Sequence, residues 1–167
     1  PMRAAGTASN IKVMSAEEFQ NEYFNYSNYV YVRSQKQFGS LINLVTGEPE
    51  KNVYINVSYT DKQTGQDYYI AEIIELLKKG RKIVLMGDFG LGKSRCIKQL
   101  FDSISVEAVG NPYVFAINLR DHWGLKRGIE ILRRHFEELG LNANNFIKNY
   151  ERPNAIYLLD GFDEIGT

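Results

Sequence analysis

Apolar and polar positions along this chain follow two different periods, and the change of period separates predicted strands from predicted helices. Apolar runs within residues 82–87, 113–119 and 155–160 are typical of buried parallel strands. In the segments around them, apolar residues recur every three or four positions, which predicts helices. The predicted helices cover residues 67–79, 93–104, 126–139 and 142–150. The pattern therefore predicts an α/β fold, a three-layer parallel sheet of at least three strands with flanking helices.

The first sixty residues follow no single period. Residues 1–10 are small and polar and are predicted to be a disordered linker. Ser15 followed by Glu18 resembles a capping box and predicts a short helix. Three further segments are typical of short strands, namely 29–32, 38–45 and 53–59. We therefore expect a small α+β lead-in at residues 11–60 and the main domain at 61–167.

The segment GDFGLGKS, between the strand at 82–87 and the helix at 93–104, has every fixed position of the phosphate-binding pattern G-x-x-x-x-G-K-[ST]. Its glycines let backbone N–H groups curl around phosphates, Lys93 adds a full positive charge, and the Ser94 hydroxyl is a Mg²⁺ ligand. No N-K-x-D guanine-reading motif occurs, so ATP with Mg²⁺ is the preferred ligand. The predicted nucleotide-binding residues are Gly87, Asp88, Phe89, Gly90, Leu91, Gly92, Lys93, Ser94 and Arg95.

A second acidic motif follows the last predicted strand, which ends in Asp160. A carboxylate at the end of a parallel strand emerges where α/β sheets hold ligands, so Asp160 is a candidate metal ligand together with Ser94. Asp163 or Glu164 could polarise the attacking water, and with Lys93 they form the predicted catalytic set. Alternatively, these two acidic residues form the solvated first turn of the next helix.

The sequence YLLDGFDEIG, combined with the phosphate loop, resembles the NACHT group of STAND P-loop NTPases. Residues 113–121 also resemble the strand that NACHT domains place between their two Walker motifs, and the resemblance covers about residues 53–167. It implies an ATP-hydrolysing switch that oligomerises when it senses a ligand, in many bacterial members an antiviral defence protein. The implied partners are ATP, further copies of the full-length protein, and an unknown activating ligand sensed by a more C-terminal region.

The sequence stops at Thr167, soon after the second motif, so the resemblance implies a C-terminally truncated NTPase domain in which hydrolysis is slow or absent. An AAA-like or nucleic-acid-dependent ATPase motor is the alternative function, and it would need an arginine finger. Arg120 and Arg127 are the nearest candidates for that finger. Either arginine could instead be a solvated surface residue.

The amino-acid composition limits the classes of partner that this segment is expected to have. Twenty basic and twenty acidic residues give a formal net charge of zero, which argues against a nucleic-acid surface on this segment. The single cysteine, Cys96, excludes an internal disulfide and suits a reducing cytosol. We find no secretory or membrane-spanning apolar run, and so expect a cytoplasmic protein without a membrane partner.

The remaining candidate residues have both structural and functional interpretations. Tyrosines ahead of the phosphate loop could stack on adenine, although such tyrosines usually belong to the core. These candidates are Tyr59, Tyr68 and Tyr69. We expect Cys96 to lie in the core and Trp123 to pack within its loop, with a protomer contact as the alternative for Trp123. His122 and His135 lack metal-ligand spacing and are expected at the surface or at helix ends.

Overall fold

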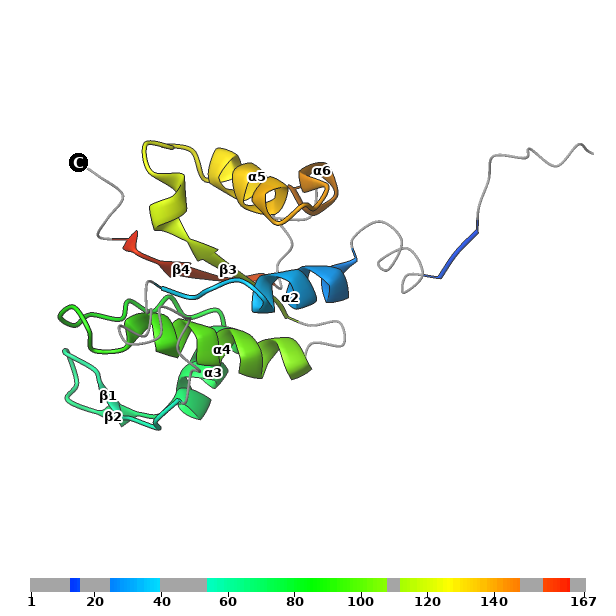
Figure 1. The fold of residues 1–167 in the computed structure, drawn as a ribbon. Coiled ribbons are helices and arrows are strands. Elements are labelled where there is room, and N and C mark those ends of the chain that lie inside the picture. Colours follow the sequence, from blue (N-terminus) through cyan, green and yellow to red (C-terminus); the bar gives the residue numbers. More distant parts are fainter. Residues whose placement is uncertain (1–12, 16–24, 40–53, 108–111, 148–154, 163–167) are drawn as a thin grey trace, which may run out of the picture.

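A two-stranded parallel sheet forms the centre of the molecule, and helices lie on both sides of it (Figure 1). Strand β3 (Tyr113–Asn118) pairs with β4 (Ala155–Asp160) in one continuous register. Helices α3 (Ile70–Lys78) and α4 (Lys93–Glu107) lie on one side of the sheet. Helices α5 (Gly128–Glu138) and α6 (Ala143–Ile147) lie on the other. The computed structural model describes residues 13–15, 25–39, 54–107, 112–147 and 155–162.

The α/β class and two of the predicted strands are confirmed. Residues 113–118 and 155–160 form strands almost as the apolar runs predict. Every residue of β3 from Tyr113 to Ile117 is buried, as expected for a strand covered on both faces. A short helix of tighter winding, η2 (Leu119–His122), begins where β3 ends.

The strand expected at residues 82–87 is not formed. Residues 81–88 adopt neither helix nor strand. Ile83 and Leu85 contact the core, whereas Val84 and Met86 are 82% and 68% exposed. A strand needs a hydrogen-bonded neighbour for its backbone groups. Among the described residues, no strand pairs with this segment, so the apolar run alone was insufficient.

The strand expected at residues 29–32 is a helix instead, α2 (Tyr26–Ser34). The Asn25 side chain caps this helix by accepting a hydrogen bond from the Asn28 N–H at 3.1 Å. Its buried residues are Tyr26, Tyr29 and Arg33. Their spacing of three and four places them on one helical face, and this pattern outweighs the local alternation of Tyr and Val.

The other early elements differ in part from the prediction. The expected strand 53–59 is described from residue 54 onward, and of residues 54–59 only Tyr59 is in a strand, as part of β1 (Tyr59–Thr60), which pairs antiparallel with β2 (Asp67–Tyr68). Because β2 uses residues 67 and 68, α3 begins at Ile70 rather than at 67. Phe38 and Gly39 are not in a strand. Residues 16–24, 40–45 and 148–150, which carry other predicted elements, lie outside the described part of the chain.

Aromatic and aliphatic side chains from both sides of the sheet form one core. Cys96 is fully buried, as predicted. The histidines are not at the surface, because His122 and His135 are 1% and 6% exposed, but each lies in the last turn of a helix, η2 and α5, as the alternative expectation had it. Burial lowers the pKa of His135 to about 3, so its imidazole is neutral. Trp123 does not pack within its loop as expected, since it is 69% exposed, on the turn after η2.

Candidate functional site

The phosphate-loop sequence forms a turn that leads directly into α4. Gly90 and Gly92 both have a φ of +85°, in the left-handed region that other residues rarely adopt. A Cβ atom placed on either glycine would meet no atom within 4 Å. The loop therefore requires glycine for its backbone conformation, and open space lies beside both glycines.

Lys93, the first residue of α4, folds back over this loop. Its Nζ donates hydrogen bonds to the carbonyl oxygens of Gly87 at 2.6 Å and Asp88 at 3.1 Å. An ammonium group has three donors, so these two contacts are compatible with a third contact to a phosphate oxygen. The loop thus holds a positive charge at the N-terminus of a 15-residue helix, where the helix dipole also favours an anion.

The other residues predicted to bind nucleotide lie in the same segment as Lys93 and differ in their exposure to solvent. Asp88, Phe89, Gly90 and Leu91 are exposed, and Phe89 and Leu91 show large apolar side chains to solvent. Ser94 and Arg95 are partly buried in the first turn of α4. The exposed tip and the partly buried helix start form one continuous segment from Gly87 to Arg95.

Ser94, the predicted metal ligand, has a neighbour that the sequence did not indicate. A Cβ placed on Gly39 would lie 2.7 Å from the Ser94 Cβ and 2.8 Å from its Oγ, closer than real Cβ contacts. Gly39 also has a φ of +73°. The chain just after α2 therefore lies directly against Ser94, and only glycine fits there.

The carboxyl end of the sheet collects polar side chains around Asp160. Asp160 is the last residue of β4, is 9% exposed, and lies opposite Asn118 in the ladder. The Asn118 side chain donates to an Asp121 carboxylate oxygen at 2.9 Å. Two elements at neighbouring strand ends thus bring oxygen-bearing side chains together, as expected for the ligand-binding edge of a parallel sheet.

A buried cation, Arg33 of α2, faces this acidic end. Only 4% of Arg33 is exposed, and burial lowers its pKa, while the charges of Asp121 and Asp160 act in the opposite direction. Sequence reasoning missed Arg33 because it occurs within the apolar segment YVYVRS. The sequence pattern that could have indicated its burial is its spacing from Tyr26 and Tyr29, which places all three residues on one helical face.

Gly161 follows Asp160 and lets Arg120 approach the strand end. Gly161 has a φ of +76°, and a Cβ there would lie 2.9 Å from the Arg120 Cγ. The Arg120 side chain thus packs on its own sheet. Arg127, the other arginine-finger candidate, is exposed and lies 3.9 Å from a Glu130 carboxylate oxygen.

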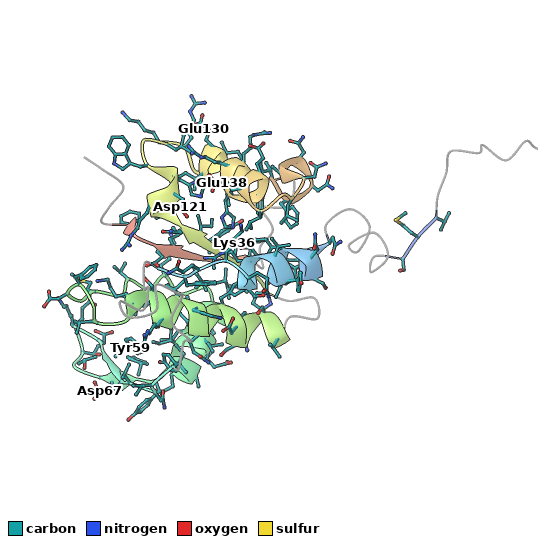
Figure 2. All side chains as sticks on the ribbon, in the orientation of Figure 1. Lys36, Tyr59, Asp67, Asp121, Glu130 and Glu138 are labelled. Carbon is teal, nitrogen blue, oxygen red and sulfur yellow. The ribbon has the colours of Figure 1, made fainter. Side chains whose placement is uncertain are left out.

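The candidate tyrosines lie near α4 or on the surface. Tyr59 is half-buried, its hydroxyl lies 3.4 Å from the Tyr54 hydroxyl, and burial raises the pKa of Tyr59 and of Cys96 in α4. Figure 2 shows Tyr59 on the opposite side of the sheet from Asp121. Tyr68 is half-buried, and Tyr69 is 50% exposed at the start of α3. A raised pKa keeps the Cys96 thiol neutral and makes it a poor nucleophile.

The two remaining catalytic candidates, Asp163 and Glu164, lie outside the described residues. Within the described residues, no group of three His, Cys, Asp or Glu side chains could hold a metal. The hydroxyl of Ser94 and the carboxylate of Asp160 are nevertheless hard oxygen donors of the kind that Mg²⁺ binds.

Comparison of the chain with known protein families, with curated proteins and with solved structures found no match. None of the described helices has both the length and the apolar character needed to cross a membrane.

Proposed function

We propose that this chain binds a nucleoside triphosphate, preferably ATP, through the loop from Gly87 to Arg95. The observation that carries this proposal is the loop geometry. Two left-handed glycines, Gly90 and Gly92, stand beside open space, and the Lys93 ammonium lies over the loop at the start of α4. Backbone N–H groups, a helix dipole and a fixed cation together favour a polyphosphate anion.

The metal ion proposed to bind together with the nucleotide is Mg²⁺. Ser94 would hold it from the loop and Asp160 from the sheet, with phosphate oxygens and water completing the coordination. The ion would supply charge neutralisation at the transferred phosphoryl group. Asp163 or Glu164 would accept a proton from the attacking water. The proposed activity is ATP hydrolysis, slow or absent in this chain.

The finer fold proposal is a P-loop NTPase domain with helices on both faces of a larger parallel sheet. Support comes from the order of elements: the loop leads into α4, and the next two strands, β3 and β4, are parallel neighbours. Asp160 at the end of β4 agrees with a Walker B position. Helices on both sides of the sheet also suit this class (Figure 1).

Within that class we propose a NACHT-type STAND switch, cytoplasmic, in which bound nucleotide controls self-association of the full-length protein. The motif YLLDGFDEIG supports this, and antiviral defence is the corresponding biological role. The second candidate, an ATPase motor, has less support because Arg120 packs on its own sheet and Arg127 contacts a carboxylate.

Size measurement with and without Mg-ATP distinguishes the two candidates. Light scattering is recorded for the wild type, Glu164→Gln and Asp160→Asn in the full-length protein. A switch predicts that Glu164→Gln traps the ATP-bound, assembled form, whereas Asp160→Asn binds Mg-ATP weakly and does not assemble. Rapid multiple turnover without any change in size would contradict the switch and favour the motor.

A further inference from the structure

Arg33 is a buried cation, and no carboxylate of the described residues forms an ion pair with it. Its Nε donates to the Ala116 carbonyl oxygen at 2.7 Å, and its Nη1 donates to the Lys36 carbonyl oxygen at 3.3 Å. The central carbon of the guanidinium lies 3.6 Å from the centre of the Phe38 ring. These neutral partners fix the guanidinium in place without neutralising its charge.

The place where Arg33 is fixed is close to the acidic end of the sheet. Ala116 is two residues before Asn118, which lies opposite Asp160 in the ladder. Two residues of a strand span about 7 Å, and neighbouring strands are about 5 Å apart. Asp121 is held at the same strand end by the 2.9 Å hydrogen bond from Asn118. The charge of Arg33 and the charges of these two carboxylates therefore attract each other through space.

Arg33 and Asp160 are the two buried side chains of the described residues that carry a full charge. A buried charge is costly unless an opposite charge compensates it. An arginine that compensates a carboxylate from a distance reduces the negative potential there without occupying the carboxylate oxygens. Those oxygens stay available to a metal ion.

Arg120 adds a second positive charge at this end of the sheet. Its side chain packs on Gly161, the residue after Asp160, since a Cβ on Gly161 would lie 3.4 Å from the Arg120 Nε. The described charges at this end are thus two carboxylates, of Asp121 and Asp160, and two guanidinium groups. Because these charges balance, a divalent cation without nucleotide gains little electrostatic energy here. A triphosphate would bring the missing negative charge.

We propose that Arg33 is a resident counter-ion of the acidic end of the sheet and makes metal binding at Asp160 depend on nucleotide. Arg33 touches neither nucleotide nor metal in this role and acts through Asp160, so it is a positioning residue. Without its charge, Asp160 and Asp121 attract a divalent cation on their own. With its charge, the ion is retained only together with phosphate oxygens. This role rests on the proposed function, in which Asp160 is the metal ligand.

Binding of Mn²⁺ without nucleotide tests the counter-ion, and the electron paramagnetic resonance signal of free Mn²⁺ measures it without any turnover. We expect Arg33→Gln to bind Mn²⁺ at least tenfold more tightly than the wild type, because it removes the charge. Arg33→Lys keeps the charge and should bind like the wild type. Arg134→Gln is the matched control, since Arg134 pairs with Glu138 at 2.9 Å on the surface of α5, and it should leave Mn²⁺ binding unchanged.

The double variant Arg33→Gln/Asp160→Asn locates the bound ion. It should lose the additional Mn²⁺ binding, whereas unchanged tight binding would place the ion elsewhere and overturn the proposal. Equal Mn²⁺ affinity of the wild type and Arg33→Gln, or equally tightened binding by Arg33→Lys, would also overturn it. If circular dichroism shows that Arg33→Gln is unfolded, Arg33→Met replaces it, because methionine can still pack on Phe38. Tight Mn²⁺ binding by the wild type without nucleotide would overturn the counter-ion without any variant.

Titration of Mn-ATP into the wild type separates this role from the proposed function. Binding of Mn-ATP, combined with equal Mn²⁺ affinity of the wild type and Arg33→Gln, would overturn the counter-ion alone. Absence of Mn-ATP binding would overturn the proposed function, and the counter-ion with it.

Discussion

At the scale of single residues, three glycines determine the shape of the candidate site for different reasons. Gly90 and Gly92 are required by their backbone angles, whereas Gly39 is required by both its angle and its contact with Ser94. Only the first two belong to a motif that can be found in the sequence. Gly39 is 55 positions before Ser94 (94 − 39), so no local pattern connects them.

The contact between Gly39 and Ser94 predicts a specific mutational effect. Gly39→Ala should displace Ser94 and weaken Mg²⁺-dependent ATP binding about tenfold, while ATP binding in EDTA changes little. Gly65→Ala is the matched control, because Gly65 has the same φ of +73° and a Cβ there meets no atom within 4 Å. Calorimetric titration checks both, and equal losses would show that backbone strain alone is responsible.

Buried His135 predicts that stability falls in mild acid. Burial lowers its pKa to about 3, while in the unfolded chain it stays near 6.5. Between these pH values the unfolded state binds the extra proton, so the free energy of unfolding decreases as pH falls, by about 1.4 kcal/mol per pH unit from this group. Burial also lowers the pKa of His122, which acts in the same direction.

Urea unfolding at pH 7.5 and pH 5.5 measures this effect. The wild type should lose more stability between these pH values than His135→Asn, which does not titrate there. Equal losses in the two proteins would contradict the assignment of a strongly lowered pKa to His135.

At the scale of elements, α2 shows where sequence reasoning stops. The alternation Tyr29-Val30-Tyr31-Val32 is a valid strand pattern, yet the residues form a helix because Tyr26, Tyr29 and Arg33 find partners on β3. Those partners are more than eighty residues away in sequence, as for Tyr26 and Val114. By contrast, α4 and α5 are confirmed because their apolar periodicity is long, and β3 because its apolar run is buried on both faces. Strand β4 is confirmed as well, although its burial alternates and Leu159 is 44% exposed.

The cap of α2 gives a test at this scale. Asn25→Ala removes the hydrogen bond to the Asn28 N–H and places alanine at a φ of +25°, so we expect a loss of about 1–2 kcal/mol in the free energy of unfolding. Asn25→Gly tolerates the angle and should lose only a few tenths of a kcal/mol. Chemical denaturation measures the free energy of unfolding of both variants. Equal stability of the two would contradict the stabilising role assigned to the Asn25 cap.

At the scale of the whole molecule, local sequence motifs locate the candidate residues but not the residues that surround them. The phosphate loop and the acidic end of β4 follow from local motifs. Arg33 and Gly39 were missed because they approach the site from α2 and the residues after it, through tertiary contacts. The expected strand at 82–87 was wrong because a sheet position depends on neighbours and not only on apolar character.

The central claim is that the loop from Gly87 to Arg95 binds Mg-ATP through the charge of Lys93. Isothermal titration of Mg-ATP into the wild type, Lys93→Ala and Lys62→Ala tests it most directly, since Lys62 is an exposed lysine on the β1–β2 turn. We predict that Lys93→Ala loses affinity by a hundredfold or more, about 2.7 kcal/mol, while remaining folded. Lys62→Ala should bind like the wild type. Equal affinity in all three proteins, or no binding by the wild type, would contradict the account.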